Sequence, residues 1–198
     1  MDDKEQKFKT YRSLSDMHRF RLRLFAEGIL TGIFAGIVIS FFRFALSEME
    51  YLRGALYNRL WVSDWSINAC WFAVLIAIAF ILHKLNCIEP MAAGSGIPQV
   101  KGAILGLMKM RWLHILLVKL TAGIIGIGAG LSLGREGPSI QLGAVAAQGV
   151  SRLMGRTRME ERYLLTSGAS AGLAAAFNAP LAGGIFALEE LHRNFYIM

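Results

Sequence analysis

Two short polar breaks within long apolar runs carry the residues that could do chemistry in this sequence. One break is Gly-Arg-Glu-Gly-Pro over residues 134–138. Glycine lets the backbone leave a helix, and proline suits the first turn of a new helix, so we predict that a helix begins within this break. The N–H groups of such a terminus, among them those of Arg135 and Gly137, attract anions. Glu136 therefore lies where a mobile anion could bind.

The other break is Gly-Ser-Gly-Ile-Pro over residues 94–98, and it has the same pattern of glycine and proline. We predict a second helix beginning at about Ile97, with the Ser95 hydroxyl and the N–H groups of Gly96 and Ile97 at its N-terminus. This helix should end near Leu107, and about ten residues cannot cross a bilayer, so it is a half-helix or re-entrant element. Two such termini aimed at the membrane midplane predict an anion site built from broken helices.

The composition places these breaks in an all-α integral membrane protein. Of the 198 residues, 55% are hydrophobic and only 18% are charged, whereas soluble domains carry about 25% charged residues. A membrane span needs roughly 20 apolar residues. Runs of this kind lie at 24–46, 66–82, 112–133 and 163–188.

Basic residues flank the apolar runs, which predicts the topology. They precede the first run, in a tail of residues 1–23, and return at 152–162. Because basic flanks lie on the cytoplasmic side, we interpret the net charge of +7 as a membrane signature rather than a nucleic-acid-binding one. We expect a multi-pass protein of the cell membrane with a cytoplasmic N-terminus, a surface helix near 12–23 that contacts the lipid bilayer, and an outer loop at 47–65. Ser95 is then reached from inside and Glu136 from outside.

Several residues inside the runs predict packing rather than chemistry. Gly28, Gly32 and Gly36 share one helix face, a spacing that lets a neighbouring backbone approach closely in a membrane. Lys119 is the only charge in the run at 112–133, and a lone intramembrane cation is expected to face the protein interior. Cys70 and Cys87 lie too far apart along one helix for a disulfide.

A third motif, Gly-Leu-Ala-Ala-Ala-Phe-Asn-Ala-Pro-Leu-Ala-Gly over residues 172–183, splits the last apolar run into two helices at its Asn and Pro. Together with the breaks at 94–98 and 134–138, it resembles the CLC family of chloride channels and chloride/proton antiporters. Three ordered motifs are more specific than any one of them. The resemblance begins at about residue 25 and implies that 24–198 is a partial CLC-type transmembrane domain, the first half of an inverted-repeat fold.

The resemblance also implies roles for individual residues. Ser95 corresponds to the serine that coordinates the central chloride. Glu136 corresponds to the gating glutamate, which competes with chloride and carries the proton. Glu190 corresponds to the inner glutamate that passes protons to the cytoplasm in antiporters and is usually replaced in channels. We therefore expect chloride/proton antiport, with chloride as the bound ion and no cofactor; the alternative is a passive chloride channel.

Two departures from the family pattern stand out. Gln99 occupies a position where the family usually has Glu. The chain also resembles only the first of two halves, and the second should supply another helix N-terminus, a chloride-contacting tyrosine and most of a homodimer interface. We therefore expect a truncated chain or a fragment that does not transport alone.

Two further hypotheses belong to other classes. An intramembrane serine protease with Ser95 as nucleophile would need glycine at position 93, where the sequence has Ala93, and a base beside the serine. A non-transporting regulatory chain would keep the breaks as remnants. We expect no enzyme activity, and no Cys/His cluster or nucleotide-binding loop indicates a metal or ATP.

Overall fold

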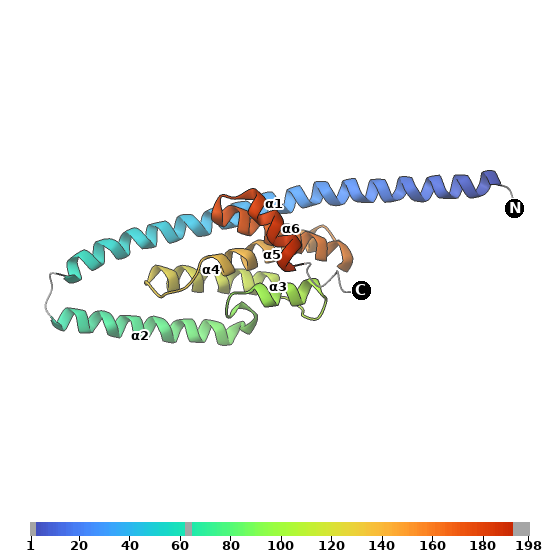
Figure 1. The fold of residues 1–198 in the computed structure, drawn as a ribbon. Coiled ribbons are helices and arrows are strands. Elements are labelled where there is room, and N and C mark those ends of the chain that lie inside the picture. The colour runs from blue at the N-terminus through green and yellow to red at the C-terminus, as the bar shows by residue number, and fades with distance from the viewer. Residues whose placement is uncertain (1–2, 62–64, 192–198) are drawn as a thin grey trace.

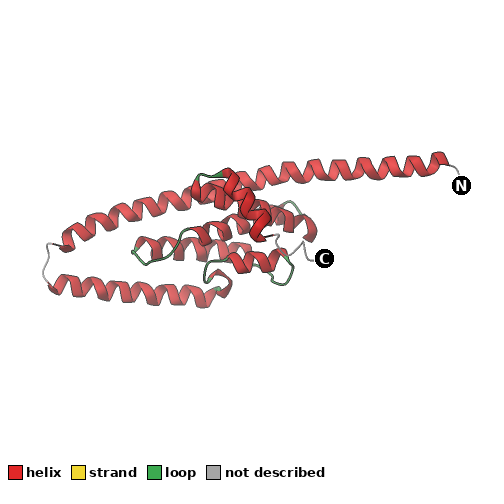
Figure 2. Ribbon diagram, viewed as in Figure 1, coloured by secondary structure: helices red, strands yellow, loops and turns green. Residues whose placement is uncertain are grey.

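In a computed structural model, residues 3–61 and 65–191 are described, and their regular elements are all helices (Figure 2). The prediction of an all-helical chain is confirmed for these residues. In chain order the elements are α1 (Asp3–Trp61), α2 (Trp65–Ile88), η1 (Pro90–Ala92), α3 (Ile97–Ile104), α4 (Trp112–Gly128), α5 (Glu136–Leu153), α6 (Arg158–Phe177), α7 (Pro180–Phe186) and η2 (Ala187–Leu191).

The longest element, α1, has 59 residues and extends well past the bundle at its N-terminal end (Figure 1). Its segment Leu22–Arg59 is long and apolar enough to cross a membrane. The helix runs through the predicted boundary between residues 23 and 24 without a break. The outer loop predicted at 47–65 is wrong up to Trp61, because the polar residues there are mostly good helix formers and no proline interrupts them. It is also wrong at Trp65, where the next helix begins, and residues 62–64 lie outside the described part of the chain.

The second membrane-length helix is α2, which runs antiparallel to α1 on the other side of the bundle (Figure 1). It packs against α4. Cys70 and Cys87 on α2 are exposed free thiols, so the prediction that they form no disulfide is confirmed.

The core of the bundle is the pair α5 and α6, which α1 covers. Their backbones are in near contact at Gly143, where an added Cβ would lie 2.9 Å from the Cα of Gly172. Gly168 lies against the same stretch of α5. Small residues on both helices permit this close approach.

The glycine stripe of α1 packs less tightly than its spacing suggests. An added Cβ at Gly28 would lie 3.5 Å from the Ser167 hydroxyl, and one at Gly32 would lie 3.9 Å from Ala171 Cβ, which are ordinary contacts. An added Cβ at Gly36 would meet no atom within 4 Å. The tightest backbone contacts of glycines lie between α5 and α6 instead. The spacing of glycines thus identifies a helix face but not the helix that packs against it.

The shorter elements follow the predicted breaks. α3 begins at Ile97 as predicted but has only 8 residues and ends at Ile104, before Gly106 in a left-handed conformation (φ 78°). α4 has 17 residues and ends at Gly128, earlier than the predicted limit of 133. α6 and α7 separate at Asn178, which adopts φ 54°, and Pro180 opens α7.

Candidate anion site

A cavity of about 770 Å³ lies where the N-termini of α3 and α5 meet. Ser95 and Ile97 line it from the first terminus, and Glu136 and Gly137 line it from the second. The rest of the wall comes mainly from α2, α4, α6 and α7, together with the loops that lead into α3 and α5. The structure therefore brings together, in one cavity, the two breaks that lie about 40 residues apart in the sequence.

The two termini touch through Gly137. An added Cβ at this residue would lie 2.6 Å from the carbonyl oxygen of Ser95 and 2.9 Å from its Cα. Any side chain at position 137 would push the two segments apart, so glycine is required by the close approach and not by its backbone conformation.

The α3 terminus is built by two glycines around Ser95. Gly94 and Gly96 have φ values of 69° and 87°, a region that L side chains rarely adopt. Gly96 is the N-cap of α3, and the N–H of Ile97 donates to the Ser95 Oγ at 3.4 Å. The serine hydroxyl is thus held at the positive end of a helix.

The α5 terminus begins with Glu136 as the first helical residue and Arg135 as N-cap, within the predicted break. The carbonyl of Arg135 accepts a hydrogen bond from the Ser139 hydroxyl at 2.7 Å, which fixes the first turn. Glu136 is exposed and lines the cavity. Its carboxylate thus lies at the first turn of a helix, where negative charge is stabilised.

Two of the six predicted anion-site residues do not line the cavity. Gly96 is buried against the side chain of Gln141. Arg135 is exposed and acts in this region through its backbone. Their predicted contact with an anion stays a prediction.

Three polar side chains that the site predictions did not include hold the loop before α3. Lys119 Nζ donates to the carbonyls of Ala92 (2.9 Å) and Gly94 (2.6 Å), and the lysine is 4% exposed, which confirms that it faces the interior. Gln99 and Gln141 bond two further carbonyls of the loop. The only sequence signal for Gln141 was a polar residue inside an apolar helix.

Glu190 lies apart from the cavity, in η2. Its carboxylate is 3.6 Å from the Nζ of Lys101 on α3, and both side chains are partly exposed. The structure thus connects the predicted inner carboxylate to the half-helix whose N-terminus bears the Ser95 loop, and its predicted proton role stays a prediction.

A second hollow of about 590 Å³ adjoins the cavity and shares Ile127, Leu133 and Gly134 with it. Arg53 lines this hollow and donates to the Ile127 carbonyl at 2.8 Å, at the C-terminus of α4. The two hollows therefore lie side by side at the end of α4 and the loop that leads into α5.

Comparison with known proteins gives consistent matches. Residues 73–197 match the family model described as voltage gated chloride channel. The H(+)/Cl(-) exchange transporter ClcA of Vibrio cholerae is 38% identical over 175 residues, and that of Cronobacter sakazakii is 36% identical over 190 residues. The alignments cover 84% and 93% of this chain.

A solved structure agrees with the family match. It is described as a slow cyanobacterial Cl-/H+ antiporter, is 33% identical, and superposes with a TM-score of 0.75 over 86% of this chain. The chain spans 36% and 40% of the two transporters and 40% of the solved chain.

Proposed function

This chain belongs to the voltage gated chloride channel family, and from that premise we propose that it forms part of a pathway that exchanges chloride for protons across a membrane. The observation that carries the proposal is the shared cavity. Ser95 and Glu136 line it from two helix N-termini that are in van der Waals contact through Gly137. The names of the similar transporters and of the solved antiporter support the same substrates.

The geometry gives each residue a role in this proposal. Chloride binds beside Ser95, where the hydroxyl donates to it and the α3 terminus offsets its charge. Glu136, when ionised, takes an anion position at the α5 terminus and blocks the path. When a proton neutralises it, the carboxyl no longer competes, and chloride can occupy that position. Anion exchange and proton transfer thus depend on one side chain.

Glu190 is the proposed proton acceptor on the cytoplasmic side. It lies in η2 beside Lys101, away from the chloride cavity. A proton route separate from the anion route lets the two ions move in opposite directions. We further propose a cytoplasmic N-terminus, residence in the cell membrane, a homodimeric assembly and no enzymatic turnover.

The test is ion flux in liposomes that contain the protein translated from its complete reading frame. Wild-type protein is expected to drive protons uphill when a chloride gradient is imposed. Glu136→Ala should abolish the proton movement while chloride still moves, and Glu190→Gln should do the same. Proton coupling that survives both substitutions would contradict the assignment.

The same assay separates the second candidate, a passive chloride channel. The family model that matches this chain is described as a chloride channel, and this description favours the second candidate. A channel would conduct chloride without moving protons against their gradient. Uphill proton movement by the wild type therefore decides for antiport.

A further inference from the structure

A small pocket with basic side chains lies apart from the anion cavity, between the loop that follows α3 and the ends of α5 and α6. Its volume is about 80 Å³. Lys109 lines it from the loop, and Gln148 and Arg152 line it from α5. Glu161 and Arg162 line it from the N-terminal end of α6. We call these five side chains the basic pocket, and none of them lines the anion cavity.

The basic pocket carries an excess of positive charge. Among the described residues, Glu161 is the only carboxylate that lines it. Glu161 Oε1 accepts from Gln148 Nε2 at 2.6 Å and lies 3.5 Å from Arg152 Nη2, so this carboxylate offsets the charge of Arg152. Lys109 and Arg162 form no ion pair with any described residue. Two cations in one small pocket thus lack a counter-charge, which an anion would supply.

Arg162 is placed in the pocket by a glycine of the facing loop. Gly106 follows α3 with φ 78°, and an added Cβ there would collide with the Arg162 guanidinium. The guanidinium therefore occupies the space that a side chain at position 106 would fill. It is partly buried and donates no hydrogen bond to any described residue. Its planar N–H groups match a pair of oxygens on one anion, such as those of a phosphate group.

Gln148 adds a buried polar group to the wall of the pocket. It is 2% exposed, and because its Nε2 donates to Glu161, its Oε1 is the atom left without a partner in the described part of the chain. Buried acceptors are usually paired, so this oxygen calls for a donor. A ligand that carries both negative oxygens and a hydroxyl group would satisfy the two cations and this acceptor together.

The surroundings of the pocket favour a ligand from the membrane. Large apolar side chains are exposed next to the basic residues of each segment. These are Leu107, Met108, Leu153 and Tyr163. The pocket also lies in the polar stretch that separates the apolar runs of α5 and α6, and such stretches lie at the edge of the hydrocarbon core. Basic pockets between membrane helices at this depth meet the phosphates of anionic lipids.

We propose that the basic pocket binds the phosphate group of an anionic membrane lipid whose headgroup carries a hydroxyl, as a glycerol headgroup does. Arg162 and Lys109 contact the phosphate oxygens, and Gln148 Oε1 accepts from the hydroxyl. A free phosphate ion carries the same two kinds of group, so the experiment must separate the two sources. The inference does not rest on the proposed function, because binding is measured without transport.

The experiment measures the melting temperature of the detergent-purified protein translated from its complete reading frame. The probes are short-chain phosphatidylglycerol, the zwitterionic phosphatidylcholine of the same chain length, and inorganic phosphate, all at equal ionic strength. Phosphatidylglycerol should raise the melting temperature by at least about 2 °C relative to phosphatidylcholine. Phosphatidylmethanol has the same charge but no headgroup hydroxyl, and its shift should be smaller.

Two variants and a matched control locate the binding. Arg162→Gln and Lys109→Gln should each remove at least about half of the phosphatidylglycerol shift, because each loses a charged contact to phosphate. Lys84→Gln removes one exposed cation of α2 that lies outside the pocket and should keep the whole shift. Lys109 is exposed in a loop, so its variant decides should Arg162→Gln fail to fold.

Four outcomes would contradict the proposal. Equal melting temperatures in phosphatidylglycerol and phosphatidylcholine would overturn lipid binding. A shift that both pocket variants keep, or that Lys84→Gln loses equally, would show general attraction to a basic surface and overturn the site. A shift with inorganic phosphate alone would overturn the lipid as the source. Equal shifts with phosphatidylmethanol and phosphatidylglycerol would overturn the role of Gln148.

Discussion

At the scale of the residue, the candidate site depends on the absence of a side chain at position 137. Gly137 lets the first turn of α5 touch the backbone of Ser95, and a methyl group there would meet two backbone atoms closer than 3.0 Å. Backbone atoms cannot rotate aside as a flexible side chain can. The distance between the two helix N-termini is therefore set by glycine at this position.

We expect Gly137→Ala to separate the two termini and weaken chloride binding by at least about tenfold, because forcing an extra carbon into a packed contact costs about 1–3 kcal/mol. Titration calorimetry of chloride measures the effect. Gly36→Ala is the control, since an added Cβ there meets nothing within 4 Å, the residue has no left-handed conformation, and it lies outside the lining of the cavity. A chloride Kd for Gly137→Ala equal to that of Gly36→Ala would show that the contact does not matter.

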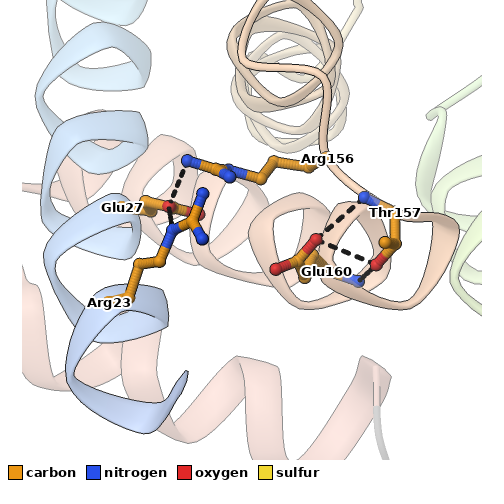
Figure 3. A network of polar contacts seen from close by, with 5 residues as sticks. All are labelled: Arg23, Glu27, Arg156, Thr157 and Glu160. Atoms are coloured by element: carbon orange, nitrogen blue, oxygen red, sulfur yellow. Dashed lines mark hydrogen bonds and ion pairs between the residues drawn. The ribbon is translucent and has the colours of Figure 1, made fainter. Parts of the chain in front are cut away.

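At the scale of the element, α1 holds the bundle at three points along its length. At the first, Glu27 accepts from Arg156 at 2.6 Å and from Arg23 at 3.0 Å (Figure 3). At the second, Arg43 donates to Asn178 Oδ1 at 2.7 Å, at the C-terminus of α6. At the third, Arg53 caps the C-terminus of α4. Cations at helix C-termini are favourable, so α1 stabilises the ends of two other helices.

The first of these points gives a stability prediction. Glu27 is 5% exposed, so removing its partner leaves a buried carboxylate with only the largely exposed Arg23. We expect Arg156→Met to lower the free energy of unfolding by about 2–3 kcal/mol. Denaturant titration in detergent micelles measures this loss.

The control for that experiment is Arg158→Met, two residues along the chain at an exposed position. It should change the free energy of unfolding by less than about 0.5 kcal/mol. The double variant Glu27→Met, Arg156→Met should recover most of the loss, because both charges are gone. A double variant as unstable as Arg156→Met alone would argue against the buried pair.

The N-terminus of α6 gives a pH prediction. Thr157 and Glu160 form a reciprocal cap (Figure 3), in which the Thr157 N–H donates to the Glu160 carboxylate at 2.8 Å and its hydroxyl donates at 2.9 Å. These bonds, first the backbone one, lower the pKa of Glu160 below its ordinary value of 4.5. The turn precedes the apolar run at 163–188.

Because this pKa is lower in the folded protein, the stabilisation is fully present at neutral pH. It should decline as the pH falls below about 4.5 toward the folded value. Thr157→Ala should cost about 1 kcal/mol at pH 7 and reduce the loss between pH 5 and pH 3. Thr157→Ser keeps the cap and is the control. Thermal melts at the two pH values test this, and identical pH slopes for Thr157→Ala and wild type would refute the role of the cap.

At the scale of the whole molecule, the sequence predicts those features of the fold that depend on residues close together in the chain. The helix starts at Ile97 and Glu136 follow from local glycine and proline chemistry, and both are confirmed. The continuation of α1 to Trp61 does not follow from local composition, because charged residues are as typical of a loop as of an exposed helix face.

The features of the site that the sequence does not predict depend on contacts between residues far apart in the chain. The bond from Gln141 to the Met91 carbonyl joins positions 50 residues apart, and no local pattern reveals it. The glycine stripe of α1 was expected to meet another backbone, yet the tightest approach lies between α5 and α6. The spacing of residues in the sequence identifies helix faces and helix breaks. Which helix faces pack against each other is seen only in the three-dimensional structure.

The arrangement of the bundle leads to a prediction about membrane topology. Glu27 and Arg59 are 32 residues apart on α1, about 48 Å at 1.5 Å per residue, which exceeds the ~30 Å hydrocarbon core. A helix of this length that crosses the membrane has its two ends on opposite sides. The Arg156 loop lies at the Glu27 end, so exposed residues near it share that side.

Single cysteines test which side is which, after the exposed Cys70 and Cys87 are replaced by alanine. With a cytoplasmic N-terminus, Arg59→Cys should react with a membrane-impermeant maleimide in intact cells. Arg158→Cys, at an exposed position beside the Arg156 loop, should react only after permeabilisation. The reverse pattern would invert the topology and place Glu136 on the cytoplasmic side. Labelling of both cysteines in intact cells would contradict a single orientation, and with it the assignment of Glu136 to the outer gate.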